Sequence, residues 1–288
     1  MTSTPTSAPD LLTLIDRCTA SALDSGALLP IRTEQATVAD GGLPFAVRWV
    51  SSLAHKDAAR VEAVSRRDPA YNPFLPPDPE LTVAALGDDH LAVLNKYPVI
   101  ERHLLIVTRH FEAQTAPLSV ADLGALARVM RAHDGLGFYN GGTEAGASQP
   151  HKHLQWVPSG AGLAAFLPAA TTTAYGAVVR NPALPWDHAF VRLEAAWWRA
   201  PAALAEAFAT ACAAVGLNAN ADPMPPYNLL LTRDWLLVVP RSRDQWDGIS
   251  VNALGFAGSL FVRRAEDIER LRADGPLRLL AGVARRTR

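Results

Sequence analysis

Residues 146–155 read Gly-Ala-Ser-Gln-Pro-His-Lys-His-Leu-Gln, and this segment constrains fold and chemistry more than any other. It spaces His151, His153 and Gln155 two residues apart. Side chains alternate faces along a β-strand, so these three should point the same way and the residues between them the other way. Just upstream, residues 141–146 include three glycines, which is typical of a loop whose backbone N–H groups approach an anion. Two imidazoles and an amide beside such a loop indicate phosphate chemistry.

The H-x-H-x-Q string resembles the active-site strand of the transferase branch of the histidine-triad superfamily, in which Gln replaces the third His of the hydrolases. The longer string GASQPHKHLQ resembles the diadenosine tetraphosphate phosphorylases, also called ATP adenylyltransferases. Further strings match this family in its own order: Asn72-Pro73-Phe74, Asn95 to Val99, His103 to Leu105, Phe138 to Asn140, Tyr227 to Leu229, Val251-Asn252 and Gly255 to Gly258. The resemblance implies an α+β fold with a mostly antiparallel sheet and flanking helices. This is a histidine-triad-like architecture, similar to galactose-1-phosphate uridylyltransferase.

The resemblance assigns the catalytic roles to three residues. Neutral imidazole is a good nucleophile, and its reference pKa of about 6.5 leaves it mostly neutral at pH 7. The family places the nucleophile at His153, where attack on phosphorus would give a covalent nucleotidyl-imidazole. His151 would be a flanking phosphate donor or an orienting group. Gln155 would donate its amide N–H to a phosphate oxygen, and it supplies no titratable proton.

The resemblance also suggests residues that bind the substrate's phosphates. Asn95 and Lys96 match an Asn-Lys pair of the family, and Asn140 ends a strand that faces the loop. Lys56 is similar to a phosphate-binding lysine, although Asp57 follows it where the family often has Pro. The loop itself contributes Gly146, Ala147, Ser148 and Gln149. For the polar members of this set the competing interpretation is a turn that satisfies its own backbone.

The other histidines lack a partner spacing, so we expect packing roles for His90, His103, His110 and His188. An H-x-H pair also occurs in zinc sites, but zinc needs further Cys, His or carboxylate ligands. The uridylyltransferases often carry structural zinc through paired Cys and His, and this chain has no such pair. We therefore expect no zinc and disfavour a sugar-nucleotide substrate. Mg²⁺ could accompany a polyphosphate, held mainly by its oxygens.

Composition sets broader limits. The 288 residues have a formal net charge of −1, which gives no field to attract nucleic acid. We find no run of 18 apolar residues and no signal-peptide pattern at the start, so we expect a cytoplasmic protein without a membrane partner. The two cysteines indicate no disulfide framework. We predict an N-terminal catalytic region at 1–165 and a C-terminal region at 166–288, packed as one unit in a monomer or homodimer.

Local patterns predict the individual elements. Helices are expected over residues 10–24, 119–134, 194–215 and 266–280, and a linker over 159–186. Strands are expected over residues 44–53, 81–86, 91–95, 104–108, 138–140, 151–157, 227–232, 235–240 and 259–262.

The resemblance implies an enzyme that converts diadenosine tetraphosphate and inorganic phosphate to ATP and ADP through an adenylyl-His153 intermediate. Two alternatives stay open. The first is a nucleotidyltransferase that acts on nucleotide sugars. The second is a nucleotide-binding sensor without catalysis, which would have no use for a nucleophile.

Overall fold

A nine-stranded sheet, antiparallel at every pairing, organises the computed structural model, which describes residues 10–50, 71–158, 162–168 and 173–286. Its strand order is β3-β4-β5-β7-β6-β10-β11-β9-β8. The strands are β3 (Thr82–Ala85), β4 (His90–Leu94), β5 (Leu104–Thr108), β6 (Leu136–Gly141), β7 (His153–Val157), β8 (Val178–Val179), β9 (Ala189–Arg192), β10 (Tyr227–Leu231) and β11 (Trp235–Pro240). The predicted α+β class is confirmed.

Each face of the sheet is covered by a different layer. Neighbouring residues such as Phe138 and Tyr139 alternate between two separate hydrophobic cores, as the two-residue period of a strand requires. Helices α3 (Val120–Ala132) and α4 (Pro201–Ala214) lie together over one face, while α1 (Leu11–Ser25) packs beside β3. On the other face lies a small sheet of β1 (Thr33–Asp40), β2 (Leu43–Val50) and β14 (Ser259–Val262), with α5 (Glu266–Asp274) and α6 (Pro276–Val283) beside it. The described elements also include short helices and two-residue strands. These are η2 (Thr143–Ala145), η3 (Leu163–Phe166), η4 (Ala195–Arg199), η5 (Ala253–Ala257), β12 (Gln245–Trp246) and β13 (Ile249–Ser250).

The two predicted regions share this sheet. Strand β6 from the first region pairs directly with β10 from the second, with Asn140 opposite Asn228. A continuous ladder therefore connects them, while the boundary at residue 165 stays a prediction.

Two predicted helices are interrupted by proline. The helix expected over 194–215 is split into η4 and α4 at Ala200, since Pro201 disfavours the helical conformation of the residue before it but suits the first position of a new helix. The helix expected over 266–280 is split in the same way at Gly275-Pro276. The linker prediction for 159–186 is also wrong in its described parts, because Phe166 and Trp186 are buried in the core.

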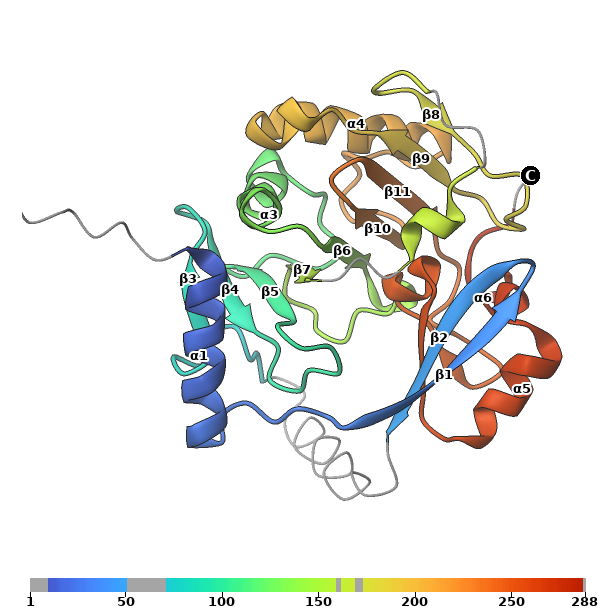
Figure 1. Ribbon diagram of the computed structural model, residues 1–288. Helices are drawn as coiled ribbons and strands as arrows, with labels where there is room; N and C mark the ends of the chain where they lie inside the picture. Colours follow the sequence, from blue (N-terminus) through green and yellow to red (C-terminus); the bar gives the residue numbers. More distant parts are fainter. Residues whose placement is uncertain (1–9, 51–70, 159–161, 169–172, 287–288) are drawn as a thin grey trace, which may run out of the picture.

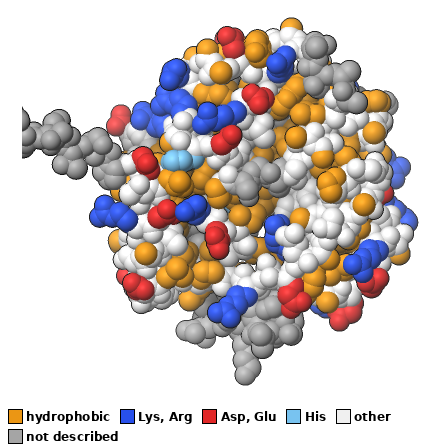
Figure 2. Space-filling model, in the orientation of Figure 1, with side chains coloured by type: hydrophobic (Ala, Val, Ile, Leu, Met, Phe, Trp, Pro, Cys, Tyr) orange, Lys and Arg blue, Asp and Glu red, His pale blue; other side chains and the backbone are white. Residues whose placement is uncertain are grey.

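One face of the molecule carries charges of both signs. On the face drawn in Figure 2, the described basic and acidic side chains lie interspersed. Among the described residues, no helix is long and apolar enough to cross a membrane.

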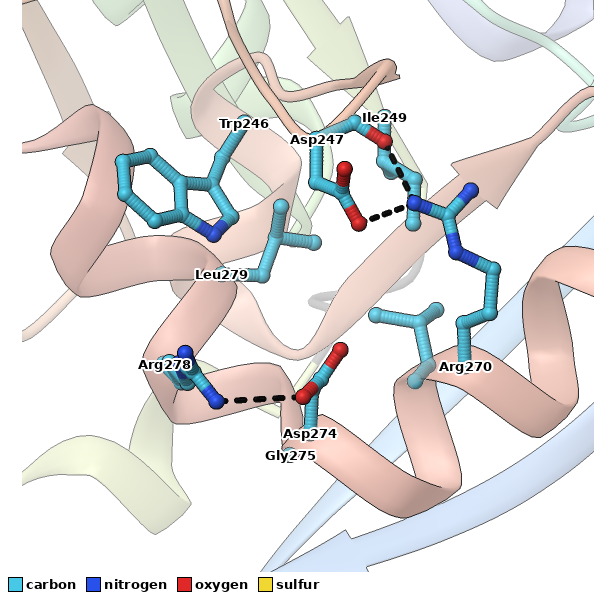
Figure 3. A pocket seen from close by; sticks show the side chains of 9 residues that line it. Trp246, Asp247, Ile249, Arg270, Asp274, Gly275, Arg278 and Leu279 are labelled. Carbon is cyan, nitrogen blue, oxygen red and sulfur yellow. Dashed lines mark hydrogen bonds and ion pairs between the residues drawn. The ribbon is translucent and has the colours of Figure 1, made fainter.

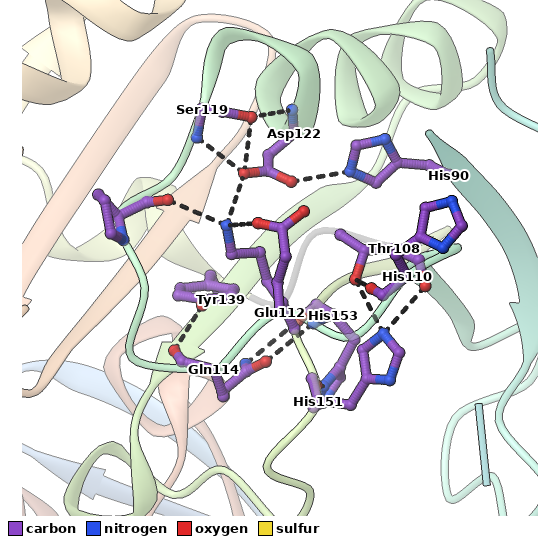
Figure 4. Close-up of polar contacts among 12 residues, drawn as sticks. His90, Thr108, His110, Glu112, Gln114, Ser119, Asp122, Tyr139, His151 and His153 are labelled. Atoms are coloured by element: carbon purple, nitrogen blue, oxygen red, sulfur yellow. Dashed lines mark hydrogen bonds and ion pairs between the residues drawn. The ribbon is translucent and has the colours of Figure 1, made fainter. Parts of the chain in front are cut away.

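A buried ion pair anchors the sheet to α3. The Lys152 side chain is 1% exposed and points away from the two histidines beside it in sequence. Its Nζ donates to Asp122 Oδ2 at 3.2 Å, to Glu112 Oε2 at 2.6 Å and to the Pro117 carbonyl at 3.0 Å. Asp122 also accepts from His90 Nε2 at 2.8 Å and forms a capping box with Ser119 (Figure 4). All three ammonium hydrogens thus have acceptors.

Removing one member of this pair should be costly. Asp122→Ala leaves the Lys152 charge buried with one carboxylate fewer, so we expect the free energy of unfolding to fall by about 3–5 kcal/mol. Urea denaturation measures the loss. The control is Asp274→Ala, which removes an exposed i,i+4 partner of Arg278 and should cost less than about 1 kcal/mol. Equal losses in the two variants would contradict this account.

Candidate active site

The catalytic strand presents its polar side chains to the sheet face opposite α3. In the ladder, His153 lies opposite Val107, and Gln155 lies opposite Leu105 on one side and Phe138 on the other. His151, just before β7, forms an isolated bridge with Ala113. The predicted alternation is confirmed, since Lys152 points to α3 while the rings of His151 and His153 both contact Phe74.

The tautomer of His153 follows from one hydrogen bond. Its Nδ1 lies 2.8 Å from the backbone carbonyl of His151, which can only accept, so Nδ1 carries the hydrogen and Nε2 keeps its lone pair. Among the described residues, Nε2 has no hydrogen-bond partner. Burial lowers the pKa of His153 to about 4, against the opposing effect of that carbonyl. His153 is thus a neutral imidazole with a free lone pair, as a nucleophile must be.

Both ring nitrogens of His151 are already used by the protein. Its Nε2 donates to the Thr108 carbonyl at 2.9 Å, with Thr108 Oγ1 at 2.8 Å (Figure 4). Its Nδ1 accepts from Asn72 Nδ2 at 2.9 Å. The ring is fully buried, and burial lowers its pKa. Of the two roles predicted for His151, phosphate donor or orienting group, this geometry favours the second.

The backbone of the strand is held by a buried glutamine. Gln114 Oε1 accepts the His153 N–H at 2.8 Å, and Gln114 Nε2 donates to the carbonyls of Asn140 and His153 at 2.9 and 3.3 Å (Figure 4). Tyr139 Oη donates to the Gln114 carbonyl at 2.6 Å. The backbone at His153 is therefore held by Gln114, from the loop before α3, and Gln114 is in turn held by Tyr139 of β6.

The glycine loop closes on itself. The N–H groups of Ala145 and Ala147 donate to Gly142, and that of Gly146 donates to Thr143, so these three are directed into the loop. This differs from the predicted anion cradle. Ser148 and Gln149 lie between this loop and His151 in the sequence. Within the described chain, their backbone N–H groups have no hydrogen-bond partner.

Glycine is required at position 146 for two reasons. Its φ is +89°, and a Cβ there would lie 2.7 Å from the Val251 carbonyl. A polar cluster of Asn140, Asn228 and Arg241 lies against the glycine loop. Asn140 Oδ1 accepts from Asn228 Nδ2 and from the Ala253 N–H, both at 2.9 Å. Arg241 and Asn228 both donate to the Ala145 carbonyl. Asn140 is 3% exposed, and the contacts of its Oδ1 shape the loop.

The remaining predicted residues contact other partners or fall outside the described part. Asn95 contacts His103 Nδ1 at 3.1 Å. Lys96 is 43% exposed and lies 3.9 Å from Asp78. Lys56 falls outside the described residues.

Two hollows exist away from the histidines. One of about 490 Å³ is lined by Leu163, Leu167, Arg233 and Trp235, among others. The other, of about 20 Å³, lies between Trp246, Arg270 and Leu279 (Figure 3). Neither is lined by a predicted site residue, and the second is far smaller than a nucleotide. In the described part of the chain, no group of three or more His, Cys, Asp or Glu side chains is arranged to hold a metal ion.

Comparison with known proteins identifies the family of this chain. Residues 1–171 match the family model of the Ap4A phosphorylase N-terminal domain, and residues 182–286 match that of the ATP adenylyltransferase C-terminal domain. The chain belongs to the Ap4A phosphorylase family. Protein APA1 of Saccharomyces cerevisiae (strain ATCC 204508 / S288c) is 28% identical over 295 residues, covering 89% of this chain and 88% of that protein. Diadenosine 5',5'''-P1,P4-tetraphosphate phosphorylase 2 of the same strain is 29% identical over 263 residues, covering 79% of each.

Solved structures of family members confirm the fold. The crystal structure of yeast Ap4A phosphorylase Apa2 has a TM-score of 0.79 and 24% identity, covering 96% of this chain and 98% of that one. Its complex with AMP gives a TM-score of 0.76 at 25% identity, with 96% of each chain covered. The predicted histidine-triad-like architecture is therefore correct.

The contact between His103 and Gln155 was not foreseen from the sequence. His90 and His188 have the expected structural roles, since His90 bonds Asp122 and His188 bonds backbone groups. His103, by contrast, donates from Nε2 to Gln155 Oε1 at 2.9 Å. Its position in a string that matches the family was the available signal. Gln114, Thr108 and Arg241 gave no signal, because their contacts exist only in the folded chain.

The His153 ring should stay neutral through the physiological range. With a pKa lowered to about 4, the proton is absent above that value and binds only as the pH falls through it. The His153 ring signal in NMR spectra, assigned with His153→Gln, should therefore not shift between pH 8 and pH 5.5, whereas an unperturbed imidazole titrates near ~6.5. A midpoint above pH 6 would contradict this effect of burial.

Proposed function

We propose that this chain cleaves diadenosine tetraphosphate by phosphorolysis, releasing ATP and ADP. The observation that carries the proposal is the buried, neutral His153, whose Nε2 lone pair has no hydrogen-bond partner among the described residues. Family membership and the names of the yeast relatives give the substrate class. A site for binding alone would not need an unprotonated, unpartnered imidazole nitrogen.

The first half-reaction would form an adenylyl-enzyme. His153 Nε2 attacks the phosphorus nearest one adenosine, a P–N bond forms, and the P–O bond to the other three phosphates breaks, so that ATP leaves. The ring gains positive charge as the P–N bond forms. The His151 carbonyl, 2.8 Å from Nδ1, stabilises that charge, as a preorganised acceptor should.

In the second half-reaction, an oxygen of inorganic phosphate attacks the adenylyl phosphorus. The P–N bond breaks, ADP leaves, and Nε2 regains its lone pair. Gln155 lies next to this position on the same face and carries no ionisable proton. We therefore propose that phosphate outcompetes water here. Mg²⁺ would accompany the polyphosphate through its oxygens, and Ser148, Gln149, Lys96 and Lys56 would bind phosphate groups.

Phosphate dependence tests the reaction class. With inorganic phosphate present, diadenosine tetraphosphate should give ATP and ADP in equal amounts, resolved by chromatography. Without phosphate, turnover should stop after one equivalent of ATP per enzyme. ATP and AMP formed at the same rate without phosphate would make the protein a hydrolase. A preference for a nucleotide sugar such as ADP-glucose would favour that alternative substrate, and binding without turnover would favour a sensor.

A matched pair of variants tests the nucleophile. His153→Ala should lower turnover by at least ~10³, because the covalent route is lost. The control is His188→Ala, since His188 is also buried and its Nδ1 also bonds the carbonyl two residues earlier, at 2.7 Å. Its Nε2, however, accepts the Asn181 N–H, so the folded fraction of this variant should keep its turnover.

The intermediate gives a second readout for the same pair. Substrate labelled at the adenylyl phosphorus should leave an acid-labile, alkali-stable label on wild type and His188→Ala, and none on His153→Ala. Phosphate should discharge it as ADP. Turnover without label under single-turnover conditions would point to direct displacement.

A further inference from the structure

A chain of three hydrogen bonds connects a backbone amide to Gln155. The Tyr97 N–H donates to Asn95 Oδ1 at 3.1 Å. Asn95 Nδ2 lies 3.1 Å from His103 Nδ1, and His103 Nε2 lies 2.9 Å from Gln155 Oε1. The Asn95 amide, the His103 ring and the Gln155 amide can each either donate or accept at a given contact, so each hydrogen bond fixes the orientation or tautomer of the next group.

The direction of this chain is fixed at its first link. A backbone N–H can only donate, so Asn95 must turn its oxygen to Tyr97 and its NH₂ group to His103. His103 Nδ1 must then accept, which places the ring hydrogen on Nε2. Gln155 must in turn present its oxygen to that hydrogen. Its NH₂ group then has no hydrogen-bond partner among the described residues and is free to bind a substrate.

This polarity requires a neutral His103, because only the neutral ring accepts at one nitrogen and donates at the other. Desolvation lowers the pKa of His103 to about 4, although the hydrogen bond to Gln155 opposes this shift. The ring of Phe138 packs against His103 with 5.8 Å between centroids. The requirement is therefore met at neutral pH.

We propose that Asn95 and His103 are positioning residues that make Gln155 present its NH₂ group, and never its carbonyl, to the reacting phosphate. The phosphate in this statement rests on the proposed function, while the orientation itself does not. An amide turned the other way would direct a carbonyl oxygen at an anion and remove a donor from the transition state. This role for Asn95 replaces the direct phosphate contact predicted from the sequence.

The tautomer of His103 tests the orientation without any substrate. In ¹⁵N-histidine-labelled wild type at pH 7.5, long-range ¹H–¹⁵N spectra should show the hydrogen of His103 on Nε2 and a lone pair on Nδ1, with His103→Gln giving the assignment. A hydrogen on Nδ1 would overturn the proposal, whatever the enzyme acts on. This measurement stands even if every variant below fails to fold.

Asn95→Asp should reverse the chain. The carboxylate still accepts from Tyr97 but can no longer donate to His103, so at pH 8.5 the ring hydrogen should move to Nδ1. Gln155 then has to turn its NH₂ group to Nε2, and kcat for phosphorolysis should fall by about 100-fold, as for loss of one transition-state donor. The control is Asn218→Asp, an exposed asparagine with the same side-chain contact to the N–H two residues later, which should stay within about twofold of wild type.

Each result decides the matter. Reversal of the tautomer with wild-type turnover would overturn the proposal. If His103 in Asn95→Asp instead takes up a second proton, Nε2 keeps its hydrogen, and turnover must then stay near that of Asn218→Asp; a 100-fold loss in that state would also overturn it. Absence of phosphorolysis in wild type would refute the proposed function alone, since the spectra still report the orientation.

Discussion

The hydrogen bond between His153 Nδ1 and the His151 carbonyl is the contact on which the chemistry of this molecule depends. It joins the ring of His153, the first residue of β7, to the carbonyl two residues earlier, so its acceptor belongs to the backbone. It selects the tautomer, leaves the Nε2 lone pair free and places an acceptor where positive charge would develop. A side-chain acceptor could rotate away or become protonated, whereas a carbonyl held in the peptide plane can do neither.

Keeping that carbonyl in place explains the contacts around it. His151 is hydrogen-bonded at both ring nitrogens, and Gln114 binds the backbone at His153. Lys152, the residue between them, is bound to Asp122 of α3. The three residues 151–153 are thus held from three directions. The burial that these contacts create also lowers the pKa of His153. The structural restraints and the neutral state of the nucleophile therefore have one physical origin.

Periodicity and family strings predicted much of this arrangement, and the failures have clear causes. The hairpin of β10 and β11, the capping box at Ser119 and the shared face of His151, His153 and Gln155 depend on local patterns, which the sequence contains. The helix breaks at Pro201 and Pro276 were missed because apolar periodicity continues across them. The tertiary partners of the strand and of the glycine loop could not be recognised, because Gln114 lies 39 residues from His153 and Arg241 lies 96 residues from Ala145. Sequence position alone does not reveal such contacts before the chain folds.

Long-range partners of this kind are set by the sheet order, which brings β7 beside β5 and β6 and brings β6 beside β10. Strand pairing of that order cannot be derived from one sequence, because several orders satisfy the same alternation of apolar residues. The polar contacts that depend on it, such as the one between His103 and Gln155, are therefore found only once the sheet is known.

A histidine in the second half of the chain can be compared with the proposed nucleophile. His188 repeats the local geometry of His153: it is buried, its Nδ1 bonds the carbonyl two residues earlier, and burial lowers its pKa. The difference lies at Nε2, which accepts the Asn181 N–H in His188 and has no partner among the described residues in His153. Burial, tautomer and pKa direction are thus shared by both residues, so none of them alone distinguishes the proposed nucleophile from a structural histidine. What distinguishes His153 is the unoccupied lone pair, and that property belongs to the surrounding backbone more than to the histidine itself.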